Sequence, residues 1–242
     1  MIIVTRPTPY GEELVKLLNE AGLSAKHIPL FKIIPVGNFL ELQTKLEQLS
    51  SGDIVIVISP QVLNVIAQCH RQLSFPPLLQ YVAIGKKTAK LLQHYVATPV
   101  IYPVTQENSE SLLLLPELQH VTERRILILR GNCGRELLAT TLQSRGAVTE
   151  YYTCYQRHPI KPALNNIQDY LIDKIITITN TESLLYFEQL IDEAQKRNNT
   201  LLVSSPRIAE KATKLGWHKI ITINSADNRK LFKTLITLCH NG

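Results

Sequence analysis

The sequence predicts an α/β fold with parallel sheets, arranged as two similar lobes. Short apolar runs alternate with helix-like segments along the whole 242-residue chain, as in parallel sheets covered by helices. Three strand-and-helix elements recur in the same order about 120 residues later. A hydrophobic content of 45% is enough to bury the cores of two such lobes.

The first strand and helix precede the repeated elements. Residues 2–5 form a short apolar run typical of a buried parallel strand. A helix is expected to begin near Pro9 and to end at Gly22, with Leu14, Leu17, Leu18 and Ala21 on its apolar face.

The repeated elements each consist of an apolar run, a polar turn and a helix start. The pairs are residues 53–61 with 174–182, 81–90 with 201–210, and 100–103 with 220–223. One register relates all three pairs, which predicts two lobes with a cleft between them. Such a cleft is a preferred place for a small-molecule site.

Two extended segments interrupt the alternation and indicate a discontinuous domain. Residues 25–35 carry prolines around an apolar run, and residues 148–161 are rich in tyrosine and threonine. We expect residues 1–24 and 162–242 to form lobe one and residues 36–147 to form lobe two. The two extended segments would cross between the lobes side by side and allow them to hinge as rigid bodies.

Charge and composition exclude several kinds of partner. The net charge of +6 and the pI of about 9.1 favour an anionic partner. The basic residues are dispersed, however, and aromatics make up only 6% of the chain, so neither a nucleic-acid arm nor a base-stacking platform is expected. The four cysteines are scattered without metal-ligand spacing, so we expect no metal site.

The beginning of the chain gives no sign of export or membrane insertion. Residues 1–7 lack the basic and apolar regions of a signal peptide, and no apolar run approaches the length of a membrane span. We expect a cytoplasmic protein with reduced thiols and no membrane partner.

Small and hydroxylated residues follow many of the predicted strands. In a doubly wound sheet these turns lie at the carboxyl ends of the strands, where helix N-termini attract anions. The turns are Ser59-Pro60, Gly85-Lys86-Lys87-Thr88, Asn108-Ser109, Arg130-Gly131-Asn132, Thr179-Asn180-Thr181, Ser205-Pro206-Arg207 and Ser225. Any one of them could be an ordinary helix cap, but together they favour an anion-binding surface.

Residues 126–138 form the sharpest single motif, a strand followed by a glycine-bearing turn and a helix. The motif lacks the endings of a phosphate loop and of a dinucleotide-binding loop, so the usual nucleotide signatures are absent. Arg130 and Arg135 could hold carboxylates in bidentate fashion. Arg135 could equally pair with a glutamate on a solvated helix face.

These motifs resemble the uroporphyrinogen-III synthase family. The segments that carry the resemblance are 4–7, 58–60, 82–88, 129–138 and 147–157. It runs nearly end to end in the same order, and this order is more specific than any one motif. The resemblance implies two flavodoxin-like lobes joined by a two-stranded β-ladder.

The resemblance also implies an activity. Hydroxymethylbilane would lose water and close to uroporphyrinogen III with its last pyrrole ring inverted, in haem biosynthesis. It implies a lyase that works as a monomer without cofactor or metal, with the upstream hydroxymethylbilane synthase as a candidate transient partner. A substrate with eight carboxylates suits a basic chain with many helix N-termini.

By the same resemblance, Tyr155 is the candidate catalytic residue. A phenol is protonated at neutral pH and can donate to a departing hydroxyl. Tyr155 could instead pack on the connector, as Tyr151 and Tyr152 are expected to do. The expected substrate-binding residues are Arg6, Ser59, Pro60, Gly85, Lys86, Thr88, Arg130, Gly131, Asn132, Thr179, Asn180, Thr181, Ser205 and Pro206.

The second repeat departs from the family pattern. The family usually has Ser-Pro-Ser-Gly-like residues where this chain has 179–182, and Gly and Thr where it has Ser205 and Ile208. Glu182 also adds a negative charge near a polyanion site. These departures favour an alternative, a two-lobed non-catalytic binding or regulatory protein for a small polyanion.

Overall fold

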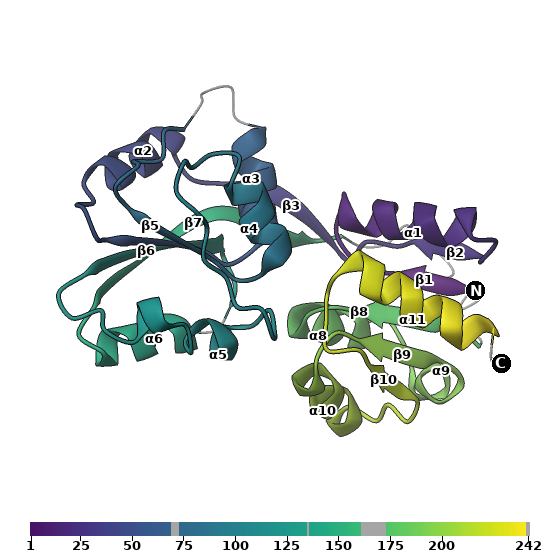
Figure 1. Ribbon diagram of the computed structural model, residues 1–242. Coiled ribbons are helices and arrows are strands. Elements are labelled where there is room, and N and C mark those ends of the chain that lie inside the picture. The colour runs from purple at the N-terminus through teal and green to yellow at the C-terminus, as the bar shows by residue number, and fades with distance from the viewer. Residues whose placement is uncertain (69–72, 135, 161–172, 241–242) are drawn as a thin grey trace. The chain divides into compact units, whose positions relative to one another are not determined.

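The structure is a computed structural model that describes residues 1–68, 73–134, 136–160 and 173–240 (Figure 1). The chain divides into two compact units. Unit 1 comprises Met1–Lys32 and His158–Gly242, and unit 2 comprises Ile33–Arg157. Each unit contains a five-stranded sheet, which confirms the predicted α/β fold class.

Unit 1 is built on a parallel sheet with the strand order β10-β9-β8-β1-β2. Its strands are β1 (Ile2–Val4), β2 (Ala25–His27), β8 (Ile175–Ile178), β9 (Thr200–Val203) and β10 (Ile220–Thr222). Its helices are α1 (Tyr10–Glu20), α8 (Thr181–Glu188), α9 (Glu193–Asn198), α10 (Pro206–Lys214) and α11 (Asn228–His240). Read in chain order, this sheet has the 2-1-3-4-5 order of flavodoxin-like folds.

Two apolar cores cover the two faces of the unit 1 sheet. On one face Ile176 and Val203 pack with α8 and α10, around Phe187 and Trp217. On the other face Val4 and its neighbours pack with α1 and α11 (Figure 1). Alternate residues of each strand therefore serve opposite faces, as a sheet buried on both sides requires.

Unit 2 has the strand order β3-β7-β6-β4-β5. Its strands are β3 (Phe31–Pro35), β4 (Ile54–Val57), β5 (Gln80–Ala83), β6 (Arg125–Gly131) and β7 (Val148–Pro159). Its helices are α2 (Phe39–Glu47), α3 (Pro60–Ala67), α4 (Lys86–Leu92), α5 (Ser109–Leu112) and α6 (Leu137–Ser144), with a 3₁₀ turn at Pro116–Leu118. Helices α2, α3 and α4 cover one face of the sheet, and α5 and α6 cover the other.

The two extended segments differ in part from expectation. Residues 25–35 are two strands, because β2 pairs with β1 in one sheet and β3 lies beside β7 in the other. The backbone bonds from Val36 to Cys154 and from Ile160 to Leu30 follow an antiparallel pattern. The chain passes between the units within β3 and β7, so part of each expected connector belongs to each unit.

The predicted repeat appears as the same succession of elements in both units, with one exception. Strand β4 and helix α3 correspond to β8 and α8, and β5 and α4 correspond to β9 and α10. The strand expected at 100–103 is reduced to a single parallel bridge between Ile101 and Val82, whereas its counterpart is the full strand β10.

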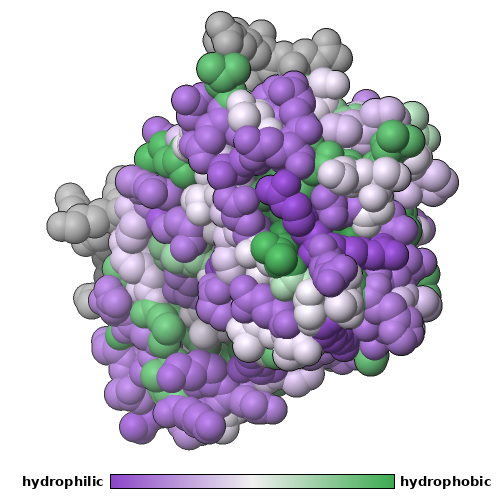
Figure 2. All heavy atoms as spheres, turned by 90° about the vertical axis from the view of Figure 1, so that its left-hand side faces the viewer, coloured by the Kyte–Doolittle hydropathy of each residue, from purple (hydrophilic) through white to green (hydrophobic). Residues whose placement is uncertain are grey.

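Apolar residues on the face shown in Figure 2 form small separate groups on a mainly hydrophilic surface. Single exposed apolar residues of this kind are normal for a monomeric surface. Within the described parts of the chain, no helix has the length and apolar character needed to cross a membrane.

Candidate functional site

The carboxyl edge of the unit 2 sheet gathers most of the predicted residues. The chain order of its strands reverses between β4 and β6, and such a switch point is where open α/β sheets bind ligands. Backbone bonds from Ile58 to Leu129 and from Ile84 to Val57 continue the pairing past the strand ends. The predicted residues at or next to this edge are Ser59, Pro60, Gly85, Lys86, Thr88, Arg130, Gly131, Asn132 and Tyr155.

Ser59 and Pro60 begin helix α3. Ser59 has an extended backbone, and its Oγ accepts a hydrogen bond from the Gln61 N–H at 3.2 Å. Pro60 occupies the first helical position, where a missing N–H costs nothing. The serine hydroxyl therefore acts as a helix cap, which was the open alternative for this turn.

A carboxylate of the chain itself occupies the start of α4. The Lys86 N–H donates to Glu107 Oε1 at 2.9 Å. A Cβ at Gly85 would come within 2.4 Å of the Glu107 side chain, so a larger residue there would require this carboxylate to move. Glu107 was missed by the sequence reasoning, although it directly precedes the cap residue Asn108. Its placement shows that this turn accepts an anion.

Thr88 is only 2% exposed and lies in the buried side of α4. Its counterpart in unit 1, Ile208, is 1% exposed and packs in the core with α8. The residue that departs from the family pattern at this position, Ile208, is therefore an apolar side chain in an apolar core. At both positions the side chain faces the interior of its own unit.

Strand β7 carries an irregularity where it meets the end of β6. Arg130 pairs with Thr153, but the next residue, Gly131, pairs with Tyr155, so Cys154 is an extra residue. Regular alternation would place Tyr155 on the sheet face opposite Tyr152. After the shift, Tyr155 joins the same core cluster as Tyr152. Bulges often re-aim a side chain in this way beside active sites.

Tyr155 lies directly against Gly131. A Cβ on Gly131 would meet the Tyr155 ring at 2.6 Å, so the glycine leaves the space that the ring fills. Tyr155 is 2% exposed, with the Arg157 guanidinium 6.0 Å from its ring centroid. Within the described residues, its hydroxyl has no hydrogen-bond partner.

Asn132 fastens the β6 turn to β7. Its N–H donates to the Tyr155 carbonyl at 2.9 Å, and its Oδ1 accepts from the Arg157 N–H at 3.1 Å. The side chain thereby continues the ladder beyond the end of β6. Both bonds hold the backbone directly after the Tyr155 Cα, so Asn132 helps to fix the segment that carries the phenol.

Arg130 lies on the other face of the sheet, under α6, and is 5% exposed. Its Nη1 lies 3.0 Å from Glu136 Oε1, and its guanidinium stacks 4.3 Å from the Tyr151 ring centroid. Burial raises the pKa of Tyr151, and the nearby Glu136 carboxylate raises it further. Arg130 therefore supports the turn after β6 from the face of the sheet that α6 covers. Arg135 lies outside the described residues.

Unit 1 brings Arg6 to the corresponding edge, after β1. Arg6 Nη1 donates to Asn228 Oδ1, and Asn228 Nδ2 donates to the Tyr10 carbonyl at 2.9 Å and to Glu13 Oε2 at 3.2 Å. Burial lowers the pKa of Arg6 to about 10, so the group stays charged at neutral pH. His27, which sequence reasoning missed, lies with Nε2 2.7 Å from the Arg6 carbonyl.

The turn after β8 begins α8. Asn180 caps the helix by accepting from the Ser183 N–H at 2.8 Å. The Thr179 carbonyl accepts from Ser204 Oγ at 3.0 Å. Thr181 Oγ1 is buried without a hydrogen-bond partner in the described part of the chain, so one polar atom of this turn has unused hydrogen-bonding capacity.

Ser205 and Pro206 begin α10 at the end of β9. Ser205 has an extended backbone, and its side chain makes no capping bond. Pro206 and Arg207 are exposed. The Arg207 cation therefore stands at the start of this helix.

The described residues contain no group of three or more His, Cys, Asp or Glu side chains that could hold a metal ion. At this edge of unit 2 the groups that can donate hydrogen bonds are backbone N–H groups, hydroxyls, lysines and one phenol.

Comparison with known proteins identifies the family. The model of the family described as "Uroporphyrinogen-III synthase HemD" matches residues 12–233. The chain is 37% identical over 243 residues to the uroporphyrinogen-III synthase of Escherichia coli (strain K12), covering 97% of this chain and 99% of that protein. It is 35% identical over 246 residues to that of Salmonella typhimurium, with 97% and 99% covered.

Among solved structures, a mutant uroporphyrinogen III synthase from the extremely thermophilic bacterium Thermus thermophilus shares the fold. The TM-score is 0.63 at 14% identity, and 99% of this chain and 100% of that one are covered. The fold is therefore retained where most residues differ. Together with the full-length sequence matches, this shows that the chain belongs to the uroporphyrinogen-III synthase family.

Proposed function

We propose that this chain cyclises hydroxymethylbilane to uroporphyrinogen III, with inversion of the last pyrrole ring and loss of water. Family membership over residues 12–233 supports the reaction. The observation that carries the proposal is the bulge of β7, which sets Tyr155 against Gly131 beside the switch point of the unit 2 sheet.

In this proposal Tyr155 is the general acid of a lyase. The C–O bond of the hydroxymethyl group breaks, and the phenol proton leaves with the hydroxyl as water. Electrons of the pyrrole nitrogen stabilise the carbon cation that remains. In this proposal the substrate itself therefore supplies the electron density that a cofactor would otherwise provide. A positioned general acid contributes roughly 10²–10⁴-fold to such a step.

The turns of both units bind the substrate carboxylates in this proposal. Backbone N–H groups at helix starts and the Arg6 cation suit carboxylates. The cap roles of Ser59 and Asn180 mean that their turns act mainly through the backbone. The buried side chains of Arg130 and Thr88 act indirectly in this proposal, because they support the turns next to them.

Positioning is the second part of the proposed mechanism. A linear tetrapyrrole is flexible, and closure without ring inversion is the competing reaction. Holding the reacting carbons together converts a rare encounter into a favoured one, and well-oriented groups can gain several kcal/mol in this way. We further propose that the chain works in the cytoplasm as a monomer and receives its substrate from hydroxymethylbilane synthase.

The decisive experiment is an isomer assay. Purified protein is supplied with hydroxymethylbilane, the products are oxidised, and the porphyrin isomers are separated. We expect the type III isomer to predominate over the type I isomer that forms without enzyme. Only type I product would contradict the proposal.

The second candidate is a binding or regulatory protein for a small polyanion. The changed turns of unit 1, with Glu182 and Arg207 near helix starts, are the observation that favours it. The burial of Ile208 weakens it, because that position faces the core. Tight porphyrinogen binding without cyclisation, unaffected by Tyr155→Phe, would support this candidate over the enzyme.

A further inference from the structure

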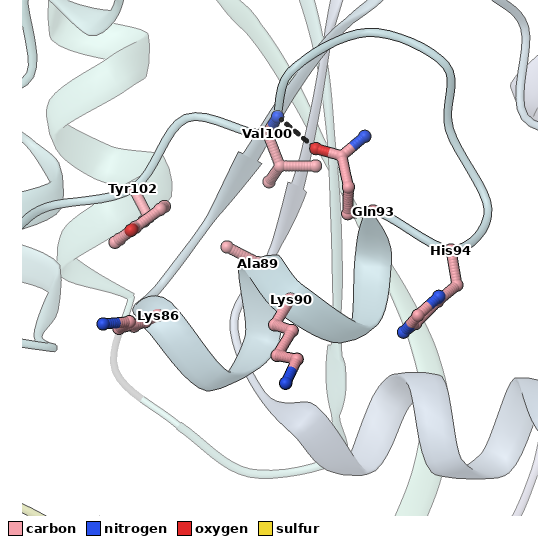
Figure 3. A pocket seen from close by; sticks show the side chains of 7 residues that line it. All are labelled: Lys86, Ala89, Lys90, Gln93, His94, Val100 and Tyr102. Atoms are coloured by element: carbon pink, nitrogen blue, oxygen red, sulfur yellow. Dashed lines mark hydrogen bonds between the residues drawn. The ribbon is translucent and has the colours of Figure 1, made fainter.

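A pocket of about 330 Å³ lies on the flank of α4 in unit 2 (Figure 3). One wall is the helix, through Lys86, Ala89 and Lys90. The other wall is the segment that runs back beside it, through Val100 and Tyr102. All of these residues belong to one unit, so the pocket is complete without the rest of the chain.

Gln93 holds the two walls together. Its Nε2 donates to the carbonyls of Val96 at 3.0 Å and Thr98 at 3.1 Å. Its Oε1 accepts from the Val100 N–H at 3.1 Å (Figure 3). Three bonds from one side chain fix the returning segment, and the Ile101–Val82 bridge ties its end to the sheet. The pocket is therefore preorganised, which lowers the entropic cost of binding a ligand.

The charge of the pocket is one-sided. Lys86, Lys90 and His94 follow each other at four-residue spacing along the same flank, and no acidic side chain lines the pocket. Among the residues described, these three side chains form no ion pair. The Glu107 carboxylate is close to Lys86 but is bonded to its backbone N–H.

A solvated basic helix face is the simple alternative. Like charges four residues apart destabilise a helix, and an anion bound between Lys86 and Lys90 would relieve that repulsion more than solvent screening does. The floor of the pocket is moreover apolar, through Ala89 and Val100, and Tyr102 adds an aromatic ring. A cationic rim over an apolar floor suits a ligand that is flat in its body and anionic at its edge.

The volume limits the size of that ligand. About 330 Å³ is at the lower end of the range for small-molecule sites, which suits one ring and excludes a whole tetrapyrrole. We infer that this pocket binds a single aromatic ring that carries carboxylates. The inference goes beyond cyclisation, because binding here requires neither Tyr155 nor turnover.

The test is a titration of the full chain with pyrrole-2,5-dicarboxylate, followed by calorimetry and by amide NMR. We expect saturable binding that shifts the amides of Ala89, Lys90, Val100 and Tyr102. Replacing Lys86 and Lys90 together by Gln should weaken binding about tenfold, since each exposed charge pair contributes up to about fivefold.

Lys87→Gln is the matched control. It removes the same charge from the same helix, but Lys87 does not line the pocket, so the affinity should stay within about twofold. Tyr155→Phe should leave this binding unchanged, and Lys90→Gln should leave the isomer assay unchanged. Failure of this inference is thereby distinguishable from failure of the proposed function.

Two further probes decide what the pocket recognises. Pyrrole-2,5-dicarboxamide has the ring without the charge and should not bind. Inorganic phosphate has the charge without the ring and should compete only weakly. If phosphate competes as well as the dicarboxylate, the pocket recognises only negative charge, and the inference is overturned. Binding that the double lysine variant leaves unchanged, or no binding at all, would overturn it too.

Discussion

At the scale of single residues, the pair formed by Gly131 and Tyr155 links the chain's sequence to its proposed chemistry. The glycine leaves the space that the phenol ring occupies, and Asn132 anchors the backbone at Tyr155 and Arg157. The other two tyrosines of β7 have different roles. Tyr151 stacks under Arg130, and Tyr152 donates to the Asn38 carbonyl at 2.6 Å.

Tyr155→Phe is expected to reduce kcat by about 10²-fold or more while KM changes little, because general-acid catalysis is lost but the turns remain. The measurement is the initial rate of type III product formation against hydroxymethylbilane concentration. Tyr152→Phe, which removes a structural hydrogen bond, should retain kcat. A Tyr155→Phe enzyme with normal kcat would show that positioning alone accounts for the rate.

Gly131→Ala is expected to destabilise unit 2 by about 1–3 kcal/mol, because the new methyl group overpacks the Tyr155 ring. In a Tyr155→Ala background the same change should cost much less, since the ring that it strikes is gone. Urea unfolding of the four proteins gives this double-mutant cycle. Equal costs in both backgrounds would mean that the ring contact is not the cause.

The pH dependence of stability should report Tyr152. Burial raises its pKa to about 12, so the folded state holds a proton that the unfolded state loses from about pH 10 upward. The stabilisation is complete below pH 10 and is lost as the pH rises toward 12. Burial also raises the pKa of Tyr81 and Tyr151.

The check is the urea midpoint of Tyr152→Phe and of the parent chain between pH 9 and pH 11. The variant should lose less stability over this range than the parent, because the contribution of Tyr152 is gone while those of the other titrating groups remain. Parallel curves would exclude a contribution from Tyr152.

At the scale of elements, a partly buried ion network between α8 and α9 supports unit 1. Lys196 Nζ lies 2.7 Å from Glu188 Oε2 and 2.9 Å from Glu193 Oε1, and it donates to the Leu215 carbonyl at 2.8 Å. Glu188 also accepts from Trp217 Nε1 at 2.6 Å. Burial opposes the charge on Lys196, but the bonds to Glu188 and Glu193 outweigh it and raise the pKa of the ammonium.

Lys196→Met should destabilise unit 1 by about 3–5 kcal/mol, because it leaves the buried Glu188 carboxylate without its cation. Lys16→Met is the control. It breaks the exposed pair with Glu20 in the same unit and should cost at most about 1 kcal/mol. Trp217, the single tryptophan of the chain, reports the unfolding of unit 1 by fluorescence. Equal costs for the two variants would refute a dominant role for burial.

Sequence patterns predict an element well where the residues of that segment alone determine its secondary structure. The apolar runs of β4, β5, β8 and β9 and the helix starts that follow them are local signals, and all appear in the structure. The bulge at Cys154, the division of residues 25–35 into β2 and β3, and the Glu107 carboxylate at α4 depend on pairing with distant segments. No local pattern encodes that pairing.

At the scale of the whole molecule, the two units share one plan in different chain order. In unit 1 the strands β1 and β2 take the places that β6 and β7 hold in unit 2, next to β8 and β4 respectively. Helix α1 joins the first pair as α6 joins the second. The switch points therefore correspond, and so do the turns at Arg6 and Asn132.

Unit 2 should fold alone, because it is one continuous segment with apolar cores on both faces of its sheet. A polypeptide of residues 33–157 is expected to show cooperative urea unfolding by circular dichroism. The segment 173–242 without residues 1–32 should not, since β1 and β2 would be missing from its sheet. Cooperative folding of that fragment would contradict this division.

The permuted plan of unit 1 also sets an order of events on the ribosome. Strand β1 is made before unit 2, yet its partner β8 is made only after all of unit 2. Until then one edge of the Ile2–Val4 segment has no β8 neighbour, and its side chains, which are buried in the folded chain, face water. A nascent chain stalled between the two would expose this apolar segment while unit 2 is already complete, so this is the interval in which a chaperone has most to protect.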